Sequence, residues 1–275
     1  MNTKKDLNRT WLITGASSGF GLMLTEAVLA RGERVAALAR TVSSLRGLEQ
    51  RHPGRLLCLS ADVRDRSSAD NAVAATGAAF GRIDVLVNNA GRGMFSAIEE
   101  TSDDRLQDLF ETNVFGVVRL VRAALPHLRN SHQGRVIQLS SAVGHATMPM
   151  GGLYAATKHA VEAISEALAG ELAGTRVRVV IVEPGYFATN FATSMEFSAP
   201  LSNYGVVRDA VLAQFNDMPA GDPQVVVERI LALADTENPP LRAAVGEDAV
   251  AWILSSLEQR SAQVREAGAF AQEVA

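Results

Sequence analysis

A tyrosine and a lysine four residues apart are the side chains of this sequence best suited to proton transfer. Tyr154 and Lys158 stand near the start of an expected helix, where a spacing of four places both on one helical face. A lysine cation held beside a phenol favours the phenolate and lowers its pKa from about 10 toward neutrality. Tyr154 is therefore a candidate acid and base, although the YxxxK spacing alone is also typical of a half-buried ring beside a solvated cation.

The stretch from Gly134 to Leu172 places this pair near a serine. An apolar strand expected over 136–140 is followed by Ser141, a short loop and the amphipathic helix that carries Tyr154. The loop can bring Ser141 back toward the helix, so that its hydroxyl hydrogen-bonds the same substrate oxygen. Three side chains from one continuous stretch are thus predicted to meet at one reaction centre.

Short apolar runs alternate with longer helical patterns along the chain. Strands are expected at 11–14, 34–39, 55–60, 85–88, 136–140, 177–183 and 241–245, and helices at about 19–31, 42–50, 67–80, 103–128, 152–172, 223–234 and 248–262. Because each crossover between parallel strands lays a helix on one face, the pattern predicts an α/β fold: a single doubly wound (Rossmann) parallel sheet with helices on both faces. Residues 1–275 are expected to form one domain.

A glycine-rich turn joins the first strand to the first helix. Its sequence is Thr14-Gly15-Ala16-Ser17-Ser18-Gly19-Phe20-Gly21. Glycines permit a tight turn and a close backbone approach, and the helix that follows offers unpaired N–H groups to a pyrophosphate. Glycine turns have many other uses, but the position between the first strand and the first helix favours binding of a dinucleotide.

The TGxxxGxG spacing of this turn resembles that of the short-chain dehydrogenase/reductase family, and the resemblance extends across nearly the whole chain. Asn88-Asn89-Ala90-Gly91 is similar to the family's NNAG element, and Pro184-Gly185 with Thr189 resembles its loop over the nicotinamide. The family's catalytic positions are matched by Asn113, Ser141, Tyr154 and Lys158. The loops after Gly185 and the PPLR segment near Pro239 are most similar to the 17β-hydroxysteroid-dehydrogenase-like branch.

The resemblance implies a role for each catalytic residue. Tyr154 would exchange a proton with the substrate oxygen, while Lys158 would keep the pKa of Tyr154 low and hydrogen-bond the nicotinamide ribose. Ser141 would orient the substrate carbonyl and stabilise its developing negative charge. Asn113 would hold a water that connects Lys158 to solvent. The hydride itself would come from the nicotinamide.

The resemblance also implies a set of cofactor contacts. Asp62 would accept a hydrogen bond from the adenine amino group and Val63 would pack on the adenine ring, whereas Asn88 could serve only to tie the sheet together. The complete set comprises Gly15, Ser17, Ser18, Gly19, Phe20, Gly21, Arg40, Asp62, Val63, Asn89, Ala90, Gly91, Tyr154, Lys158, Pro184, Gly185, Phe187 and Thr189.

The end of the second strand predicts which dinucleotide binds. An NAD site places an Asp or Glu there to accept from the ribose 2′-hydroxyl, but this strand ends in Ala39 followed by Arg40. The planar donors of an arginine can bond two oxygens of a 2′-phosphate at once. We therefore expect NADP(H) in preference to NAD(H), with Arg40 on the phosphate and help from Ser17 or Ser18.

A long irregular stretch, about 186–221, is expected to form a lid over the substrate, since connections of this length are usually functional. It carries Tyr186, Phe187, Phe191, Met195, Phe197, Leu201 and Tyr204, and the loop opposite contributes Met148 and Met150. These side chains suit a bulky apolar substrate, although they could serve only to fasten the segment. Arg92 and His145 are candidates for contacting a polar group of the substrate. In the alternative, Arg92 is merely solvated and His145 is a simple loop residue.

A homodimer or homotetramer is expected from the family resemblance, with the helices at 103–128 and 152–172 at the interface. The second of these helices carries small residues that permit close contact: Ala155, Ala156, Ala160, Ala163 and Ala167. In the alternative, these alanines pack only on the sheet.

Composition excludes several other classes of function. The net charge of -4 leaves no basic excess for a nucleic-acid backbone. Residues 1–8 lack the apolar core of a signal peptide, and no run approaches the roughly 18 apolar residues that span a bilayer. We expect a cytoplasmic protein with a small-molecule substrate and without nucleic-acid or membrane partners. The histidines show no metal-ligand spacing, and the sole cysteine, Cys58, is expected to be a buried structural thiol.

The sequence therefore predicts an enzyme that reversibly reduces a carbonyl to an alcohol with NADP(H). The alternative is a non-catalytic protein that binds the dinucleotide and uses the same fold as a sensor or interaction module. All four catalytic positions are filled, which favours the enzyme.

Overall fold

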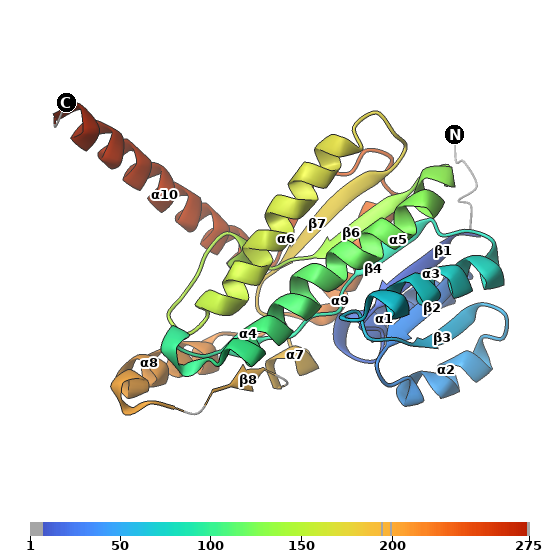
Figure 1. Ribbon diagram of the computed structural model, residues 1–275, viewed down its shortest axis with the longest axis horizontal. Helices are drawn as coiled ribbons and strands as arrows, with labels where there is room; N and C mark the ends of the chain where they lie inside the picture. Colours follow the sequence, from blue (N-terminus) through green and yellow to red (C-terminus); the bar gives the residue numbers. More distant parts are fainter. Residues whose placement is uncertain (1–7, 194, 199, 274–275) are drawn as a thin grey trace.

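A seven-stranded parallel sheet forms the centre of the molecule (Figure 1). The computed structural model describes residues 8–193, 195–198 and 200–273, so the expectation about a signal peptide at 1–8 lies almost wholly outside the described residues. Strand order is β3-β2-β1-β4-β6-β7-β9, with bounds Thr10–Thr14 (β1), Arg34–Ala39 (β2), Leu56–Ser60 (β3), Val85–Asn88 (β4), Arg135–Leu139 (β6), Arg178–Pro184 (β7) and Arg242–Val245 (β9). Every pairing is parallel, and the predicted doubly wound fold is confirmed.

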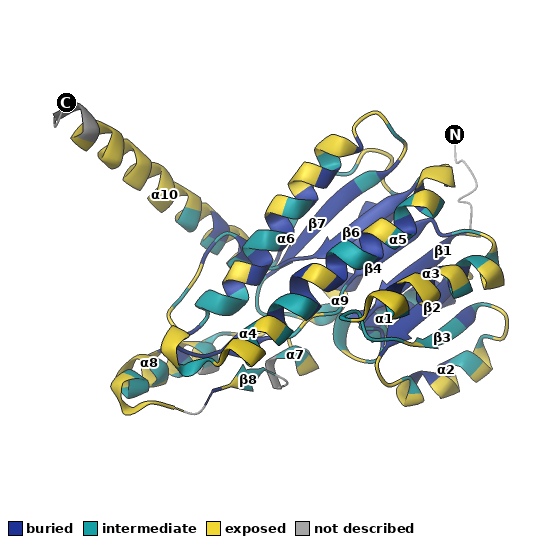
Figure 2. Ribbon diagram, in the orientation of Figure 1, coloured by how far each residue is buried: buried dark blue, intermediate teal, exposed yellow. Residues whose placement is uncertain are grey.

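Helices cover both faces of this sheet. On one face lie α3 (Arg66–Phe80), α5 (Gly116–Asn130) and α6 (Gly152–Glu171), and on the other lie α1 (Gly19–Ala30) and α9 (Pro223–Asp235), while α2 (Arg46–Arg51) packs beside β3. Successive strand residues alternate between two apolar cores, with Trp11 and Ile13 in one and Leu12 in the other. Figure 2 shows the buried strands in dark blue beneath helices whose outer faces are exposed. Cys58 on β3 is half-buried rather than fully buried, and burial raises the pKa of its thiol to about 11.

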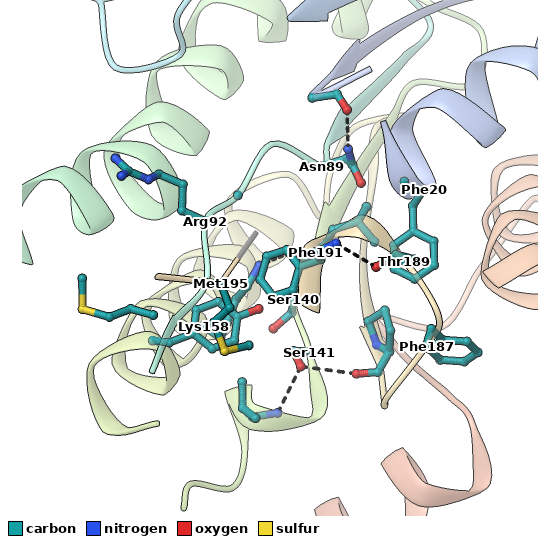
Figure 3. A pocket seen from close by; sticks show the side chains of 18 of the residues that line it. Phe20, Asn89, Arg92, Ser140, Ser141, Lys158, Phe187, Thr189, Phe191 and Met195 are labelled. Carbon is teal, nitrogen blue, oxygen red and sulfur yellow. Dashed lines mark hydrogen bonds between the residues drawn. The ribbon is translucent and has the colours of Figure 1, made fainter. Parts of the chain in front are cut away.

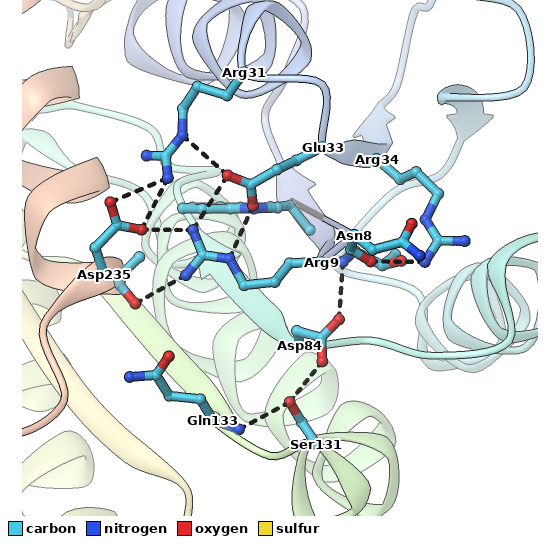
Figure 4. A network of polar contacts seen from close by, with 12 residues as sticks. Asn8, Arg9, Arg31, Glu33, Arg34, Asp84, Ser131, Gln133 and Asp235 are labelled. Carbon is cyan, nitrogen blue, oxygen red and sulfur yellow. Dashed lines mark hydrogen bonds and ion pairs between the residues drawn. The ribbon is translucent and has the colours of Figure 1, made fainter. Parts of the chain in front are cut away.

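The amino-terminal edge of the sheet is fixed by a buried network of charges (Figure 4). Glu33 is fully buried and accepts hydrogen bonds from Arg9 Nε at 2.9 Å and Trp11 Nε1 at 2.7 Å. Arg9 also pairs with Asp235 at 2.7 Å, which connects β1 to the end of α9. Buried charges are tolerated when they are paired in this way. This edge is therefore occupied by structural contacts, and the opposite, carboxyl edge holds the cavity.

The single helix predicted over 103–128 is divided into segments. It begins with α4 (Asp103–Phe110), continues through a π-helical turn (Glu111–Phe115) and ends as α5. Such π-turns are frequent at functional sites because they rotate one side chain out of the regular helical position. Asn113 lies within this turn and is buried.

The segment expected to be a lid has secondary structure of its own. It contains α7 (Asn190–Thr193), β8 (Glu196–Phe197) and α8 (Gly205–Asp217), and β8 pairs in parallel with β5 (Met94–Phe95). The sequence analysis missed α8, although Val207, Val211 and Phe215 at intervals of four residues indicate a helical face. Figure 1 shows these elements gathered at one end of the molecule, beyond the carboxyl edge of the sheet.

The last helix, α10 (Glu247–Glu273), extends well past the predicted end at residue 262. Its first turns pack on the domain through Ala249 and Ile253, whereas its second half projects away from the body (Figures 1 and 2). Of the helices in the described part of the chain, none combines the length and the apolar content needed to cross a membrane.

Candidate active site

A cavity of about 1010 Å³ opens at the carboxyl ends of the central strands (Figure 3). Most of the residues predicted to bind cofactor or to catalyse line it: Gly15, Ser17, Ser18, Gly19, Phe20, Arg40, Asp62, Val63, Asn89, Ala90, Gly91, Ser141, Tyr154, Lys158, Pro184, Gly185, Phe187 and Thr189. Two predicted residues, Gly21 and Asn113, do not line the cavity and instead support residues that do.

The glycine turn approaches its neighbours so closely that side chains do not fit. A Cβ on Gly21 would lie 2.3 Å from the carbonyl oxygen of Gly15, and a Cβ on Gly15, whose φ is +65°, would lie 2.9 Å from Ala90 Cα. Ser18 occupies the N-cap position of α1, but its side chain makes no capping hydrogen bond. The turn therefore offers a hydroxyl and backbone N–H groups at a helix amino terminus, which fits the pyrophosphate of a dinucleotide.

Asparagines of the NNAG element hold this turn in place. The Asn89 amide donates to the carbonyl oxygens of Thr14 at 2.9 Å and Gly15 at 3.2 Å. In return, the Thr14 hydroxyl accepts from the backbone N–H groups of Asn89 and Ala90. The preceding Asn88 donates to Gln138 Oε1 on β6 at 2.8 Å, so this residue does tie two strands together.

The Asn113 amide is occupied mainly by the backbone of Arg92. Its Oδ1 accepts from Arg92 N at 2.8 Å, and its Nδ2 donates to Arg92 O at 2.9 Å and to Thr157 Oγ1 at 3.1 Å. A Cβ placed on Gly91 would lie 3.5 Å from Asn113 Oδ1 and 3.9 Å from Lys158 Nζ. Asn113 and Lys158 thus both lie within van der Waals reach of the Cβ position of Gly91. A water held there by Asn113 stays a prediction.

Ser141 and Lys158 are positioned by the ends of two neighbouring strands. Ser141 Oγ donates to the Pro184 carbonyl oxygen at 3.3 Å, and Lys158 Nζ donates to Leu139 O at 2.7 Å. Figure 3 shows Ser141 and Lys158 at the same end of the cavity. Burial lowers the pKa of Lys158 to about 8, while the carboxylate of Glu162 opposes that shift.

The prediction that Lys158 lowers the pKa of Tyr154 is wrong for this structure. Burial raises the pKa of Tyr154 above its usual value, because the phenolate loses its water. Lys158 Nζ lies 5.8 Å from the centroid of the Tyr154 ring and is hydrogen-bonded elsewhere. Tyr154 is consequently protonated at neutral pH, and its phenol can donate a proton to an oxygen in the cavity.

At the other end of the cavity, Arg40 follows β2 as predicted. It is exposed, and within the described ranges its guanidinium makes no hydrogen bond or ion pair. Asp62 lies on the same wall, where hydrogen bonds from Arg64 hold the pKa of its carboxyl below the usual range. Arg40 is therefore available to an anionic ligand, whereas Asp62 already shares its oxygens with Arg64.

Residues of the segment expected to be a lid line the cavity beside Tyr154. Figure 3 shows Phe191 and Met195 reaching into it, and the Phe191 ring centroid lies 5.6 Å from that of Tyr154. Of the apolar residues expected to surround the substrate, the cavity is lined by Met148, Tyr186, Phe187, Phe191, Met195 and Phe197. Leu201, Tyr204 and Met150 do not line it. Met150 and Tyr204 belong to an apolar cluster that also contains the lining residue Met195, and Leu201 is exposed.

Sequence reasoning missed a second group of lining residues. Leu212 and Phe215 come from α8, Met218 directly follows that helix, and Trp252 comes from α10. Asp248, also on α10, accepts a hydrogen bond from the backbone N–H of Tyr186 at 2.7 Å. The helical pattern around 205–217 could have identified Leu212 and Phe215. No sequence signal indicated that the start of α10 would return to the cavity.

The two candidates for contacting a polar substrate group have different environments. Arg92 lines the cavity, but its guanidinium pairs with Asp108 at 3.3 Å and with Glu196 of β8. His145 does not line the cavity, and its Nε2 lies 2.8 Å from Glu183 Oε1. A direct role for His145 in substrate recognition is therefore excluded by its position. Arg92 joins β8 to α4 through these ion pairs.

A doubly wound sheet with a glycine turn and a deep cavity at its carboxyl edge defines a class of dinucleotide-binding α/β proteins. Comparison with known proteins identifies the family. The model of the short chain dehydrogenase family matches residues 9–198. A crystal structure of a short-chain dehydrogenase from Streptomyces avermitilis is 39% identical, with a TM-score of 0.89 over 98% of this chain and 99% of the other.

More distant relatives carry more specific names. The 3-ketodihydrosphingosine reductase of Bacteroides thetaiotaomicron is 33% identical over 86% of this chain and 87% of its own. The 3-ketoacyl-(acyl-carrier-protein) reductase of Brucella melitensis, solved in complex with NADH, is 26% identical, with a TM-score of 0.74 over 87% of this chain and 98% of the other. This chain belongs to the short-chain dehydrogenase/reductase family and is an oxidoreductase with a nicotinamide dinucleotide cofactor.

Proposed function

We propose that the protein interconverts a carbonyl and an alcohol on a bulky apolar substrate, with NADP(H) as cofactor and Tyr154 as acid and base. The observation that carries this proposal is that Ser141, Tyr154 and Lys158 line the same cavity as the glycine turn. A substrate carbonyl bound between the lid and Tyr154 would then face the nicotinamide end of a dinucleotide whose pyrophosphate lies on the turn.

The cofactor supplies the hydride, and the protein supplies the proton and the geometry. In the direction of reduction, the protonated phenol of Tyr154 donates its proton to the substrate oxygen as negative charge develops there. Ser141 donates a second hydrogen bond to that oxygen by turning away from Pro184 O, 3.3 Å distant. Lys158, whose ammonium group donates to Leu139 O, would hydrogen-bond the nicotinamide ribose. Phe191 over Tyr154 helps to exclude water.

The lining of the cavity supports a bulky apolar substrate. Each buried methylene contributes about 0.8 kcal/mol, so several added ring carbons together raise kcat/KM by at least ~100-fold. We therefore expect ring-containing ketones to be reduced at least ~100-fold more efficiently than acetone-sized ones, as measured by cofactor absorbance. Met195→Ala should reduce this ratio, and Leu201→Ala, which changes a residue outside the cavity, should not. Preference for small polar carbonyls or sugars would overturn the proposal.

The names of the relatives agree with reduction of a keto group. The resemblance to the 17β-hydroxysteroid-dehydrogenase-like branch remains a hypothesis about the shape of the substrate. Preference for NADP(H) is supported by the exposed Arg40 and by the lack of an acid at the end of β2. Location in the cytoplasm stays a prediction.

We further propose that the protein is a homodimer or homotetramer. On α6, Ala156, Ala163 and Ala167 are exposed while Ala155 is buried, so most of the small residues face outward and permit close helix contact. Light scattering at micromolar concentration should give a particle mass that is a multiple of the monomer mass. The Ala163→Arg variant should have the mass of the monomer. Ala79→Arg, at an exposed alanine of α3, is the matched control. A monomeric wild-type protein would refute the proposal.

A further inference from the structure

Behind the catalytic helix lies a buried cluster of charged residues that the proposed reaction does not use. His145 Nε2 lies 2.8 Å from Glu183 Oε1 and 3.6 Å from Glu162 Oε2. Arg242 of β9 approaches the same carboxylates, with Nε 3.0 Å from Glu162 Oε2 and 3.7 Å from Glu183 Oε1. Four elements of the chain, the loop after Ser141, α6, β7 and β9, thus meet at one point.

Both carboxylates of the cluster are almost completely inaccessible. Glu183 is 3% and Glu162 is 4% exposed, and a charge at such a depth is costly unless it is paired. Burial raises the pKa of Glu183, an effect that the hydrogen bond from His145 opposes. A Cβ on Gly144 would lie 2.8 Å from the buried Ser140 Oγ and 3.2 Å from Glu162 Oε1, so the loop backbone packs directly on the cluster.

The cluster is connected to the reaction centre in two ways. Glu183 precedes Pro184, whose carbonyl oxygen accepts the hydrogen bond of Ser141. Glu162 follows Lys158 by four residues on α6 and favours the protonated form of its ammonium group. From the other side, Ser256 of α10 donates to the carbonyl oxygen of His145 at 2.8 Å.

We propose that His145, Glu162, Glu183 and Arg242 are positioning residues, which hold the Ser141 loop against β7 and place a carboxylate one helical turn from Lys158. The part of this inference that concerns Lys158 rests on the proposed function. The anchoring of the loop does not depend on that function. The groups facing His145 are Glu183 from β7, Glu162 from α6, Arg242 from β9 and the Ser256 hydroxyl from α10.

His145, Glu162 and Glu183 also have ligand atoms within 4.8 Å of one another, a spacing compatible with a metal ion. The sequence analysis had found no such arrangement, because the three residues are far apart along the chain. Arg242 already supplies a positive charge to both carboxylates. The cluster therefore acts as a set of ion pairs.

Hydrogen exchange of the unliganded protein tests the anchoring of the loop. His145→Leu removes the donor to Glu183, and exchange of the backbone amides over 142–151 should accelerate at least ~10-fold, as expected for loss of a buried hydrogen bond to a charged group. His145→Gln retains a donor and should restore slow exchange. His132→Gln, at an exposed histidine, is the control. Unchanged exchange in a folded His145→Leu variant would refute the anchoring role.

The pH dependence of kcat/KM tests the effect on Lys158. Removing the Glu162 carboxylate disfavours the lysine cation, so Glu162→Gln should lower the pKa of Lys158 further below its value of about 8. Activity should then be lost at pH 8 to a greater extent than in the wild type and remain unchanged at pH 6. Glu171→Gln, an exposed position on α6, should leave the profile unaltered. An unshifted pH profile would refute the effect of Glu162 on Lys158. A wild-type protein that reduces no ketone would instead refute the proposed function, and the hydrogen-exchange test of the loop would remain valid.

Discussion

Replacing Tyr154 with phenylalanine is expected to lower kcat by about 10²- to 10⁴-fold, the contribution of a positioned proton donor. In the proposed reaction the phenol is the acid, and burial keeps it protonated at neutral pH by raising its pKa. Phenylalanine preserves the ring and its contact with Phe191, so the melting temperature and the dissociation constant of NADPH should change little. Rapid mixing of enzyme, NADPH and a ring-containing ketone gives kcat directly.

The matched control is Tyr204→Phe, which removes a phenol from the lid segment outside the cavity. This variant should retain wild-type kcat. If Tyr154→Phe turned over at the normal rate while remaining folded, the assignment of Tyr154 as acid and base would be wrong.

Arg40→Ala is expected to weaken NADPH binding by about 10- to 100-fold, the range for hydrogen bonds to a charged group. Arg40 is exposed at the cavity wall, and within the described residues its guanidinium makes no hydrogen bond or ion pair. NADH lacks the 2′-phosphate, so its binding should change less than twofold. Fluorescence titration of both dinucleotides measures the two constants.

Arg51→Ala, at an exposed arginine of the nearby α2, should affect neither dinucleotide. A wild-type protein with a higher kcat/KM for NADH than for NADPH would refute the preference. Unchanged NADPH affinity in Arg40→Ala would show that another residue recognises the phosphate.

The sequence was sufficient for the fold because its strands are continuous apolar runs. In a parallel sheet these runs are buried on both faces, so they stand out without alternation. The position of the candidate site could be predicted from the same parallel arrangement of the strands. Ser141 and Asn89 each come directly after a strand, and the carboxyl ends of parallel strands share one edge of the sheet. Their convergence on one cavity could therefore be expected before any coordinates were known.

What the sequence could not predict depends on burial and on distant contacts. A spacing of four suggested that Lys158 controls the pKa of Tyr154, but burial of both side chains has the larger effect. Likewise, Asn113 in the π-turn bonds the backbone of Arg92, which lies 21 residues earlier in the chain. Trp252 reaches the cavity from a helix at the far end of the chain. Such contacts leave no periodic signal in the sequence.

The most direct test of the proposed function is the transfer of deuterium from cofactor to substrate. Wild-type protein is incubated with a ring-containing ketone and NADPH that carries deuterium at the transferring position of C4, and the product is examined by mass spectrometry. Hydride transfer predicts an alcohol with one deuterium on the former carbonyl carbon. Formation of no alcohol, or of an alcohol without deuterium on that carbon, would contradict carbonyl reduction by this protein.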